Sequence, residues 1–111
     1  VKTVVDQKGK VLYFSRQPIP NSRSDQFKSG IKQIGIYVFR KKFLLEFSSW
    51  KECPLEKAEG VDMMRILEYG YPIHTYEAKD MISVDTPREL KEMESVLLQD
   101  SLYQQIFQNV S

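Results

Sequence analysis

The stretch Val84-Asp85-Thr86-Pro87-Arg88-Glu89-Leu90 joins a helix start to a carboxylate that the helix start does not require. Thr86 suits the N-cap, the proline after it suits the first helical position, and Glu89 completes a capping box. Asp85 stands just before the cap, at the end of the short apolar run 81–84. The positive helix N-terminus alone would favour a carboxylate there, but α/β proteins also present ligand-facing groups at strand-to-helix turns. Asp85 is therefore a candidate ligand-facing residue.

Apolar residues at helical spacing follow this stretch. Leu90, Met93 and Leu97 form the buried stripe of a helix that begins after Thr86. A second series, at four-residue intervals, predicts a final helix within residues 99–111 that packs on the body of the protein or on a partner chain: Leu98, Leu102, Ile106 and Val110.

Composition limits the class of protein. At 111 residues, with 41% hydrophobic and 12% aromatic residues, the chain is one globular domain or part of one. Sixteen basic residues nearly balance fifteen acidic ones, so we expect neither nucleic acid nor a membrane surface as a partner. Residues 1–5 do not form a signal peptide, and the single Cys53 excludes an internal disulfide, so a cytoplasmic location is expected. Cys53 with the single His74 makes neither a zinc site nor a convincing catalytic pair.

The first part of the chain has the pattern of a hairpin followed by a stiff segment. Residues 1–5 and 10–14 are predicted strands, joined by a turn at Asp6-Gln7-Lys8-Gly9. Two prolines then fix an extended path, which holds Arg16 at the end of a strand. Arg16 is either a solvated surface arginine or a ligand-binding one. Residues 21–30 are predicted to form a mobile surface loop.

The strongest predicted strand spans residues 32–39, and its near-continuous apolar character suits a strand covered on both faces. Gly35 indicates a bulge or a close approach by another backbone or a ligand. Gln33 and Tyr37 share one side of this strand with Gly35, because side chains alternate with a period of two. A short helix over residues 40–50 follows, with three residues predicted to face inward: Phe43, Leu44 and Phe47.

A longer helix is predicted from Cys53 to Gly70, with Pro54 at its first position. Its core stripe consists of five apolar residues: Leu55, Ala58, Val61, Met64 and Leu67. A second stripe, with Met63 beside it, is acidic: Glu56, Glu59 and Asp62. The acidic stripe is either a solvated first turn or a set of groups that hold hydroxyls or cations. Residues 71–78 alternate as a further strand.

The predicted order is therefore two strands, a loop, a strand, two helices, a strand and two helices. Such an order indicates an α/β fold with a mixed, open sheet flanked by helices. Four strands with unpaired edges would invite pairing, so we expect the domain to be incomplete as a free-standing unit.

Four groups of residues, taken together, resemble the C-terminal half of the 3-deoxy-manno-octulosonate (Kdo) cytidylyltransferases, also called CMP-Kdo synthetases. They are Val11-Leu12-Tyr13-Phe14-Ser15-Arg16 with Pro18-Ile19-Pro20; Gly35-Ile36-Tyr37; Pro54-Leu55-Glu56 with Glu59 and Arg65; and Val84-Asp85-Thr86-Pro87. The resemblance runs from Val1 to about Met93. It implies that residues 1–97 are the sugar-binding and second metal-ligand half of a cytidylyltransferase domain. Residues 98–111 would then be a C-terminal helical extension.

The resemblance implies a nucleotide-diphospho-sugar transferase fold and one reaction. The anomeric hydroxyl of an acidic sugar attacks the α-phosphorus of CTP, giving a CMP-sugar and pyrophosphate. Mg²⁺ is the implied cofactor, and Asp85 matches the family's second metal-ligand aspartate, so it is the implied catalytic and metal-binding residue. The nucleotide-binding loop and the first metal-binding aspartate belong to the other half of a family member. The 111-residue chain alone is therefore expected to be inactive.

The resemblance also implies which residues contact the sugar. Arg16 and Tyr37 match residues that bind the ulosonic acid, and a guanidinium suits the carboxylate of that acid. Gln33 stands where the family usually has histidine, and Asp62-Met63 stands where it usually has Glu-Gln. The implied substrate-binding set consists of five residues: Arg16, Gln33, Tyr37, Glu59 and Asp62. The departures leave two alternatives to Kdo open, 8-amino-Kdo and a nine-carbon sialic-like acid.

A second interpretation belongs to a different class: a non-catalytic module that uses the same fold for dimerisation or small-molecule binding. The alternating strand and the apolar tail after Leu97 would serve it equally well. For the enzyme we expect a homodimer in the pathway of surface lipopolysaccharide synthesis. The encoding reading frame discriminates the two, because an upstream nucleotide-binding segment supports the enzyme.

Overall fold

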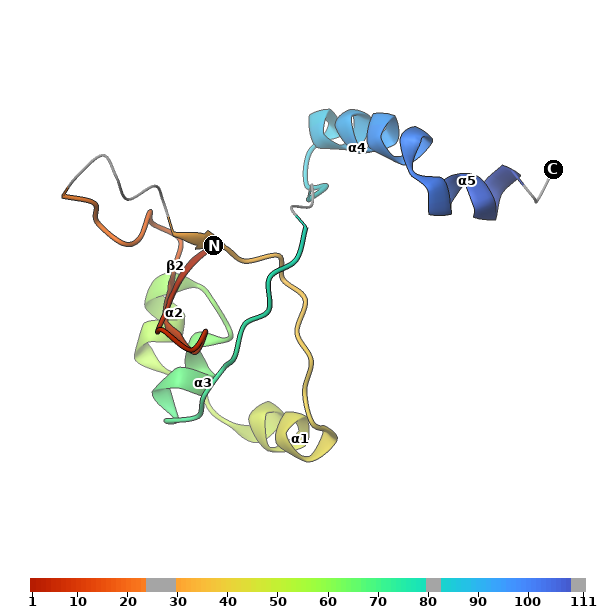
Figure 1. Cartoon of the computed structure of the whole chain (residues 1–111). Coiled ribbons are helices and arrows are strands. Elements are labelled where there is room, and N and C mark those ends of the chain that lie inside the picture. Colours follow the sequence, from red (N-terminus) through yellow and green to blue (C-terminus); the bar gives the residue numbers. More distant parts are fainter. Residues whose placement is uncertain (24–29, 80–82, 109–111) are drawn as a thin grey trace. The chain divides into compact units, whose positions relative to one another are not determined.

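The computed structural model describes residues 1–23, 30–79 and 83–108 of the chain. Its elements, in chain order, are β1 (Lys2–Val5), β2 (Val11–Ser15), β3 (Ile31–Lys32), α1 (Lys41–Ser49), α2 (Pro54–Glu59), α3 (Met64–Glu68), α4 (Pro87–Gln99) and α5 (Ser101–Gln108) (Figure 1). They fall into two compact units, Val1–Ala78 and Lys79–Ser111. The combination of helices and a sheet confirms the predicted α/β class. Over the described residues, no helix has the length and apolar character needed to cross a membrane.

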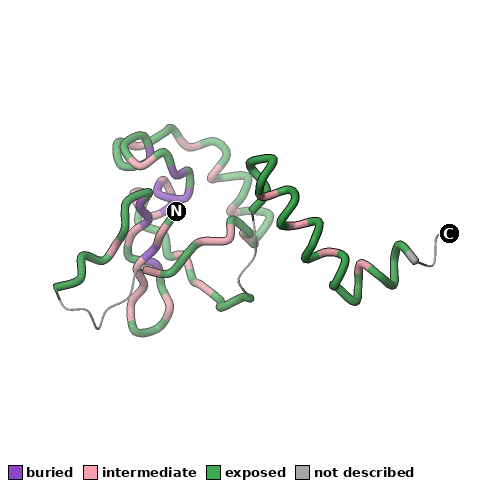
Figure 2. Tube along the Cα trace, turned by 90° about the horizontal axis from the view of Figure 1, so that it is seen from above, coloured by how far each residue is buried: buried purple, intermediate pink, exposed green. Residues whose placement is uncertain are grey.

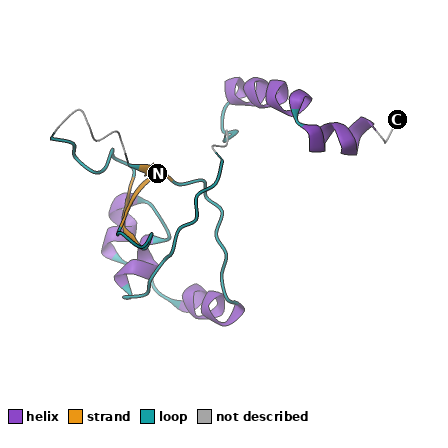
Figure 3. Ribbon diagram, viewed as in Figure 1, coloured by secondary structure: helices purple, strands orange, loops and turns teal. Residues whose placement is uncertain are grey.

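The sheet lies in the first unit, and its strand order is β2-β1-β3 with both pairs antiparallel (Figure 3). The predicted hairpin is confirmed: Thr3 pairs with Phe14, and the register shifts between Val4 and Val5. Asp6 fixes the turn, because its Oδ1 accepts hydrogen bonds from the N–H groups of Lys8 (2.8 Å) and Lys10 (2.9 Å). Residues 24–29 of the predicted loop lie outside the described part of the chain.

The predicted strand over residues 32–39 is wrong beyond its first residue. β3 pairs with β1 only through Ile31 and Lys32, and the last ladder-like bond runs from the Gln33 N–H to the Val1 carbonyl (3.1 Å). A strand needs a neighbour with free backbone groups, and the described residues supply none beyond this point. Val38 is consequently 97% exposed rather than covered on both faces. Among the described residues nothing lies within 4 Å of a Cβ built on Gly35, so no backbone of these residues approaches it closely, and the alternative of an approach by a ligand stays a prediction.

The predicted helix from Cys53 to Gly70 is two helices, α2 and α3. Gly60 adopts the left-handed conformation (φ 61°, ψ 42°) and ends α2, with its N–H bonded to the Glu56 carbonyl at 2.7 Å. The break rotates the second helix relative to the first, so the predicted stripe is continuous only in its second half. Val61 and Met64 are buried and Leu67 is half-buried, but Leu55 and Ala58 are exposed.

The predicted strand over residues 71–78 is reduced to one antiparallel bridge between Lys10 and His74. Two hydrogen bonds flank the bridge: Val11 N–H to the Ile73 carbonyl (2.8 Å) and Thr75 N–H to the Gly9 carbonyl (2.9 Å). Beyond them the segment is extended but unpaired among the described residues, and Tyr76 is 94% exposed. The prediction is therefore correct only at the hairpin edge.

The core lies between β2 and the α2–α3 pair, and the buried residues gather in this unit (Figure 2). The buried apolar residues are Val11, Phe14, Val61, Met63, Met64 and Ile66. Next to them, Trp50 stacks on Tyr69 (4.4 Å between ring centroids) and on Tyr71 (5.2 Å). Helix α1 contributes Phe43 and Phe47 as predicted, whereas Leu44 is exposed, contrary to the prediction.

The second unit contains α4 and α5, which confirm the two helices predicted after Asp85. Thr86 is the N-cap of α4 and Pro87 its first residue. Met93 and Leu97 are half-buried, but Leu90 is exposed within this chain. Residues 81 and 82 lie outside the described part, so the structure does not test the apolar run predicted before Asp85.

Candidate functional site

Arg16 follows β2 directly, and its guanidinium binds the last turn of α2. Its Nε donates to the main-chain oxygen of Glu59 at 3.0 Å, and its Nη2 donates to that of Gly60 at 2.7 Å. The last carbonyls of a helix have no partner within the helix, so a cation that binds them also complements the helix dipole. A guanidinium has five N–H donors. These two bonds leave three N–H groups that no hydrogen bond within the described residues uses.

Glu59 holds the end of β2 against α2. Its Oε1 accepts a hydrogen bond from the Tyr13 hydroxyl (3.0 Å), and its Oε2 accepts from the Ser15 hydroxyl (3.0 Å) and the Arg16 N–H (3.1 Å). The Arg16 N–H bond is the main reason why the pKa of the Glu59 carboxyl lies below its ordinary value. The family resemblance implies that Glu59 contacts substrate, and this stays a prediction. Within the described residues its carboxylate bonds to two side chains of β2 and to the Arg16 N–H.

Gln33, Tyr37 and Asp62 form a second polar group. The Gln33 side-chain amide donates to the Tyr37 hydroxyl, while Gln33 Oε1 is buried and has no hydrogen-bond partner among the described residues. Burial is the main reason why the pKa of Tyr37 lies above its ordinary value, and the negative charge of Asp62 acts in the same direction. The side chain of Asp62 is exposed. Tyr37 therefore remains a neutral hydroxyl at physiological pH, and the buried Gln33 Oε1 receives no hydrogen bond from the described residues.

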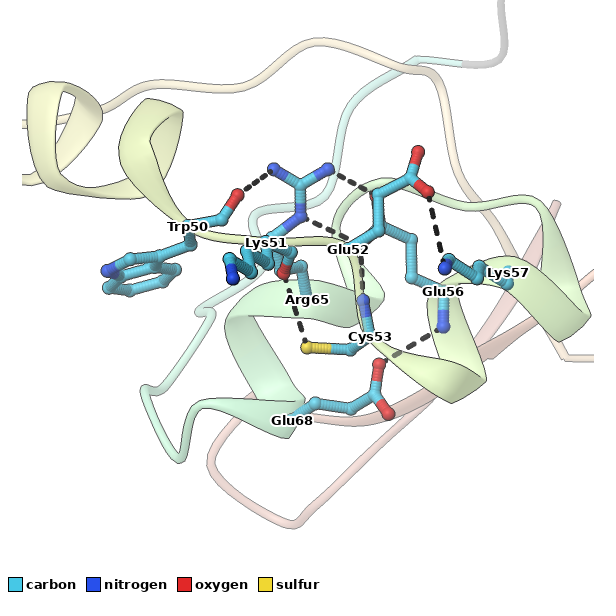
Figure 4. Close-up of polar contacts among 8 residues, drawn as sticks. All are labelled: Trp50, Lys51, Glu52, Cys53, Glu56, Lys57, Arg65 and Glu68. Carbon is cyan, nitrogen blue, oxygen red and sulfur yellow. Dashed lines mark hydrogen bonds and ion pairs between the residues drawn. The ribbon is translucent and has the colours of Figure 1, made fainter.

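The helical pattern places Glu56 in the acidic stripe with Glu59 and Asp62 and does not reveal that its side chain is buried. Glu56 is only 4% exposed, and Arg65 binds both of its oxygens, Nε to Oε2 at 2.7 Å and Nη2 to Oε1 at 2.5 Å (Figure 4). Arg65 also donates from Nη1 to the Trp50 carbonyl at 3.2 Å. The bonds from Arg65 are the main reason why the pKa of the Glu56 carboxyl lies below its ordinary value.

Two further carboxylate contacts fix the start of α2. Glu56 Oε2 accepts from the Cys53 N–H at 3.2 Å, and Glu68 binds the next two free N–H groups, those of Leu55 (2.9 Å) and Glu56 (3.1 Å). Carboxylates at a helix N-terminus satisfy free donors and complement the dipole. The one sequence signal for this arrangement is Glu56 three residues after Cys53 and two after Pro54, which has the spacing of a capping box.

Asp85 lies in the second unit, directly before the N-cap of α4. Its N–H and that of Thr86 both donate to Glu89 Oε2, at 2.9 and 2.8 Å. Its own carboxylate is exposed and accepts no hydrogen bond from the described residues. These residues contain no group of three His, Cys, Asp or Glu side chains that could hold a metal ion. Because Mg²⁺ takes only one or two carboxylates from a protein, Asp85 fits as one ligand of a site completed by other groups.

The predicted site residues thus fall into three sets. Arg16 and Glu59 are in direct contact, Gln33 and Tyr37 are hydrogen-bonded to each other, and the negative charge of Asp62 acts on Tyr37. Asp85 belongs to the other unit. Gly60 belongs with the first set, because its carbonyl accepts a hydrogen bond from Arg16, although the sequence pattern gave it no role there.

In this α/β unit the arginine is held in place and carboxylates are exposed. Such groups can bind an acidic, hydroxyl-bearing ligand. The family model described as Cytidylyltransferase matches residues 1–81. The chain therefore belongs to the cytidylyltransferases.

Three similar proteins within this class are all 3-deoxy-manno-octulosonate cytidylyltransferases. The chain is 41% identical to a 3-deoxy-manno-octulosonate cytidylyltransferase of Syntrophotalea carbinolica over 107 residues, covering 87% of this chain and 43% of the relative. The enzyme of the same name from Geobacter metallireducens is 41% identical over 102 residues, covering 81% of this chain and 40% of the relative. The enzyme of the same name from Protochlamydia amoebophila is 34% identical over 107 residues, covering 93% of this chain and 41% of the relative.

A solved structure of CMP:2-keto-3-deoxy-manno-octonic acid synthetase complexed with CTP superimposes on the chain with a TM-score of 0.80. The identity is 34%, and the match covers 88% of this chain and 41% of that one. The predicted resemblance and the predicted nucleotide-diphospho-sugar transferase fold are thereby confirmed. The chain spans about two fifths of the length of these proteins.

Proposed function

We propose that this chain supplies the sugar-binding part, and one metal ligand, of an enzyme that transfers CMP from CTP to Kdo or a related 3-deoxy-ulosonic acid. The observation that carries the proposal is the Arg16 guanidinium. One of its edges is held by two main-chain carbonyls, and three N–H groups remain for a ligand. A guanidinium held in this way offers paired hydrogen bonds to the carboxylate of an acidic sugar without first having to be ordered. The similarity to a CTP-bound CMP-sugar synthetase supports the reaction class.

The proposed reaction is a single displacement at phosphorus. The anomeric oxygen of the sugar acid forms a bond to the α-phosphorus of CTP, and the bond from that phosphorus to the oxygen bridging to the β-phosphorus breaks. Pyrophosphate leaves, and the anomeric hydroxyl loses its proton to solvent or to a nearby base. Such a step requires aligned reactants and charge neutralisation more than covalent participation by the protein. Arg16 would align the sugar by its carboxylate.

Mg²⁺ bound to the phosphates would neutralise their negative charge during transfer. Asp85 is the residue of this chain that we assign to hold it. Its carboxylate is exposed and accepts no hydrogen bond from the described residues, while the N–H groups of Asp85 and Thr86 before the helix are bonded to Glu89. The same surroundings leave Asp85 free to bind a cation without breaking the helix cap.

Gln33, Tyr37 and Asp62 are the groups that we expect to select the sugar. The buried Gln33 Oε1 would accept a hydrogen bond from a hydroxyl or an amino group of the substrate. Met63 is buried in the apolar core, so it offers no polar contact to a sugar. A site with this arrangement discriminates against acids that leave the Gln33 acceptor unpaired. Kdo, 8-amino-Kdo and nine-carbon sialic-like acids are therefore the substrates to compare.

Further parts of the proposal concern the complete protein. Because the chain spans about two fifths of its relatives, we expect the 111 residues alone to have no turnover. We also propose that the complete enzyme is a cytoplasmic homodimer that activates the sugar for lipopolysaccharide synthesis.

The test is pyrophosphate release by the protein translated from the complete reading frame, with CTP, Mg²⁺ and the three classes of acid. One acid is expected to turn over, and Asp85→Asn is expected to lower kcat by about a thousandfold or more, as for loss of a charge that acts in the transition state. Glu94→Gln is the matched control, because Glu94 is an exposed carboxylate on α4, the helix that follows Asp85. It should leave the rate unchanged.

Absence of turnover with every acid would refute the catalytic proposal and favour the binding module. Robust CMP-sugar formation by the isolated chain would refute the expectation that it is inactive alone. An Asp85→Asn variant as active as Glu94→Gln would remove the metal role while leaving the reaction class intact.

A further inference from the structure

Gly60 occupies a conformation and a position that few other residues could share. Its φ of 61° lies in the left-handed region, which glycine adopts without the steric cost that a Cβ brings. Its carbonyl accepts the Arg16 Nη2 at 2.7 Å, and the carbonyl before it accepts the Arg16 Nε. Both acceptors point at one guanidinium because the chain turns left-handed at Gly60, at the end of α2.

The open side of Gly60 also faces Arg16. A Cβ built on Gly60 would lie 3.3 Å from Arg16 Nε, 3.7 Å from Nη2 and 3.9 Å from Cζ. The shortest of these distances requires the guanidinium to move by a few tenths of an ångström. Apart from Gly60 and its chain neighbours, no other atom of the described residues is as near to that position, so the guanidinium itself fills the space that a side chain would occupy.

Two other glycines with positive φ show that this contact is specific. Gly70, at the end of α3, has φ 82°, and Gly35 has φ 81°. Nothing in the described part of the chain lies within 4 Å of a Cβ built on either of them. Substitution of Gly70 therefore introduces backbone strain alone, whereas substitution of Gly60 introduces strain and displaces Arg16.

We propose that Gly60 is a positioning residue for Arg16: its left-handed turn and missing side chain set the guanidinium in the orientation that receives the carboxylate of the acidic sugar. The role of Arg16 toward the sugar rests on the function proposed above. The positioning of Arg16 by Gly60 does not, because it is a property of the chain without any ligand.

The first test measures that property directly. Exchange of the arginine Nε–H protons with water is followed by ¹⁵N NMR in the protein translated from the complete reading frame. Gly60→Ala is expected to speed exchange at Arg16 by about tenfold, as for the loss of roughly one charge-assisted hydrogen bond. Arg65 is the internal control, because its Nε–H is bonded to Glu56 and reports whether α2 and α3 remain folded. Gly70→Ala should leave exchange at Arg16 unchanged.

The second test uses the protein translated from the complete reading frame. Because a misplacement of about 1 Å can cost about a hundredfold, a shift of a few tenths should raise KM for the sugar acid about three- to tenfold. The KM for CTP and kcat should stay within about twofold of their original values. Gly70→Ala should alter none of the three constants by more than that.

The Gly60→Asn variant distinguishes the steric effect of the added Cβ from the effect of backbone strain. Asparagine tolerates the left-handed region better than alanine, so this variant keeps the turn and still presses on Arg16. It is expected to reproduce the Gly60→Ala effects, and it replaces that variant if exchange at Arg65 shows that Gly60→Ala is unfolded. Unchanged exchange at Arg16 in both Gly60 variants, or equal effects of Gly60→Ala and Gly70→Ala, would overturn the proposal. If no acid turns over in the parent protein, the proposed function fails and the exchange measurement alone decides the role of Gly60.

Discussion

Glu56 and Arg65 lie nine residues apart on two different helices, and their side chains form a two-point ion pair inside the first unit. Only 5% of the Glu56 side chain and 15% of the Arg65 side chain is exposed. Arg65 also binds the Trp50 carbonyl and lies 5.0 Å from the centre of the Phe47 ring. One arginine therefore joins α1, α2 and α3.

Arg65→Met is expected to destabilise the first unit by about 3 kcal/mol, because it leaves the Glu56 charge buried without its partner. A buried pair adds little stability compared with an apolar pair, but a single unpaired charge is strongly destabilising. The measurement is urea unfolding followed by the fluorescence of Trp50, the single tryptophan of the chain.

Arg88→Met is the matched control for that substitution. Arg88 forms an ion pair with Glu92 on α4, but 88% of its side chain is exposed. Exposed pairs of this kind contribute about 0.3–0.5 kcal/mol, so the midpoint should hardly move. Equal effects of the two substitutions would mean that the Glu56–Arg65 pair is solvated in solution.

Acid is expected to destabilise the first unit through Glu56 and Glu59. Hydrogen bonds from Arg65 and from the Arg16 N–H, respectively, hold the pKa of these carboxyls below their ordinary value of 4.5 in the folded state. At a pH near 4.5 the unfolded chain consequently binds more protons than the folded chain, so stability falls as pH falls. The contribution is complete well above pH 4.5 and is lost as pH drops through 4.5 and then through the lowered values.

The check is the urea midpoint between pH 7 and pH 3, with Glu59→Gln as comparison. That variant keeps an acceptor for Tyr13 and Ser15 but cannot titrate, so its midpoint should depend less steeply on pH. A parent midpoint that stays constant down to pH 3 would contradict the lowered pKa values.

The turns and helix starts that depend on residues close together in the sequence could be predicted from the sequence. The Asp6 turn, the Pro54 start of α2 and the Thr86–Glu89 capping box each depend on residues within four positions of one another. For the same reason the two helices after Asp85 could be predicted from spacing alone. The family resemblance gave the class of protein, because its motifs follow one another in a fixed order.

The remaining features depend on residues that are far apart in the sequence. Glu56 is buried because Arg65 reaches it across the break at Gly60, and a helical pattern drawn through Gly60 hides that relationship. The apolar run over residues 32–39 predicts a strand, but only its first residue is paired, because the described residues provide no neighbour for the rest. The two hydrogen bonds that hold the Arg16 guanidinium are accepted by main-chain carbonyls. Every residue has such a carbonyl, so the sequence gives no sign of these bonds.

Thr86→Ala is expected to loosen the first turn of α4. The Thr86 Oγ1 accepts the Glu89 N–H at 3.3 Å, and loss of such a cap costs about 1 kcal/mol. Amide hydrogen exchange at Glu89 and Leu90 should accelerate by about fivefold for that cost. Ser95→Ala is the control, since the Ser95 hydroxyl only bonds back to the Lys91 carbonyl within the helix, a contact of little value. No acceleration beyond the control would show that Glu89 alone caps the helix.

Val38→Lys is expected to reduce self-association of the 111-residue chain. Val38 is 97% exposed on an extended segment with unpaired backbone groups among the described residues, and such an edge can recruit another chain by strand pairing. A lysine side chain on an edge opposes that pairing by charge and solvation. Light scattering and sedimentation velocity at increasing protein concentration would measure the effect. Leu45→Lys is the control, because Leu45 is 62% exposed but lies on α1, whose backbone is bonded within the helix. If both substitutions reduced association equally, apolar area and not strand pairing would be its cause.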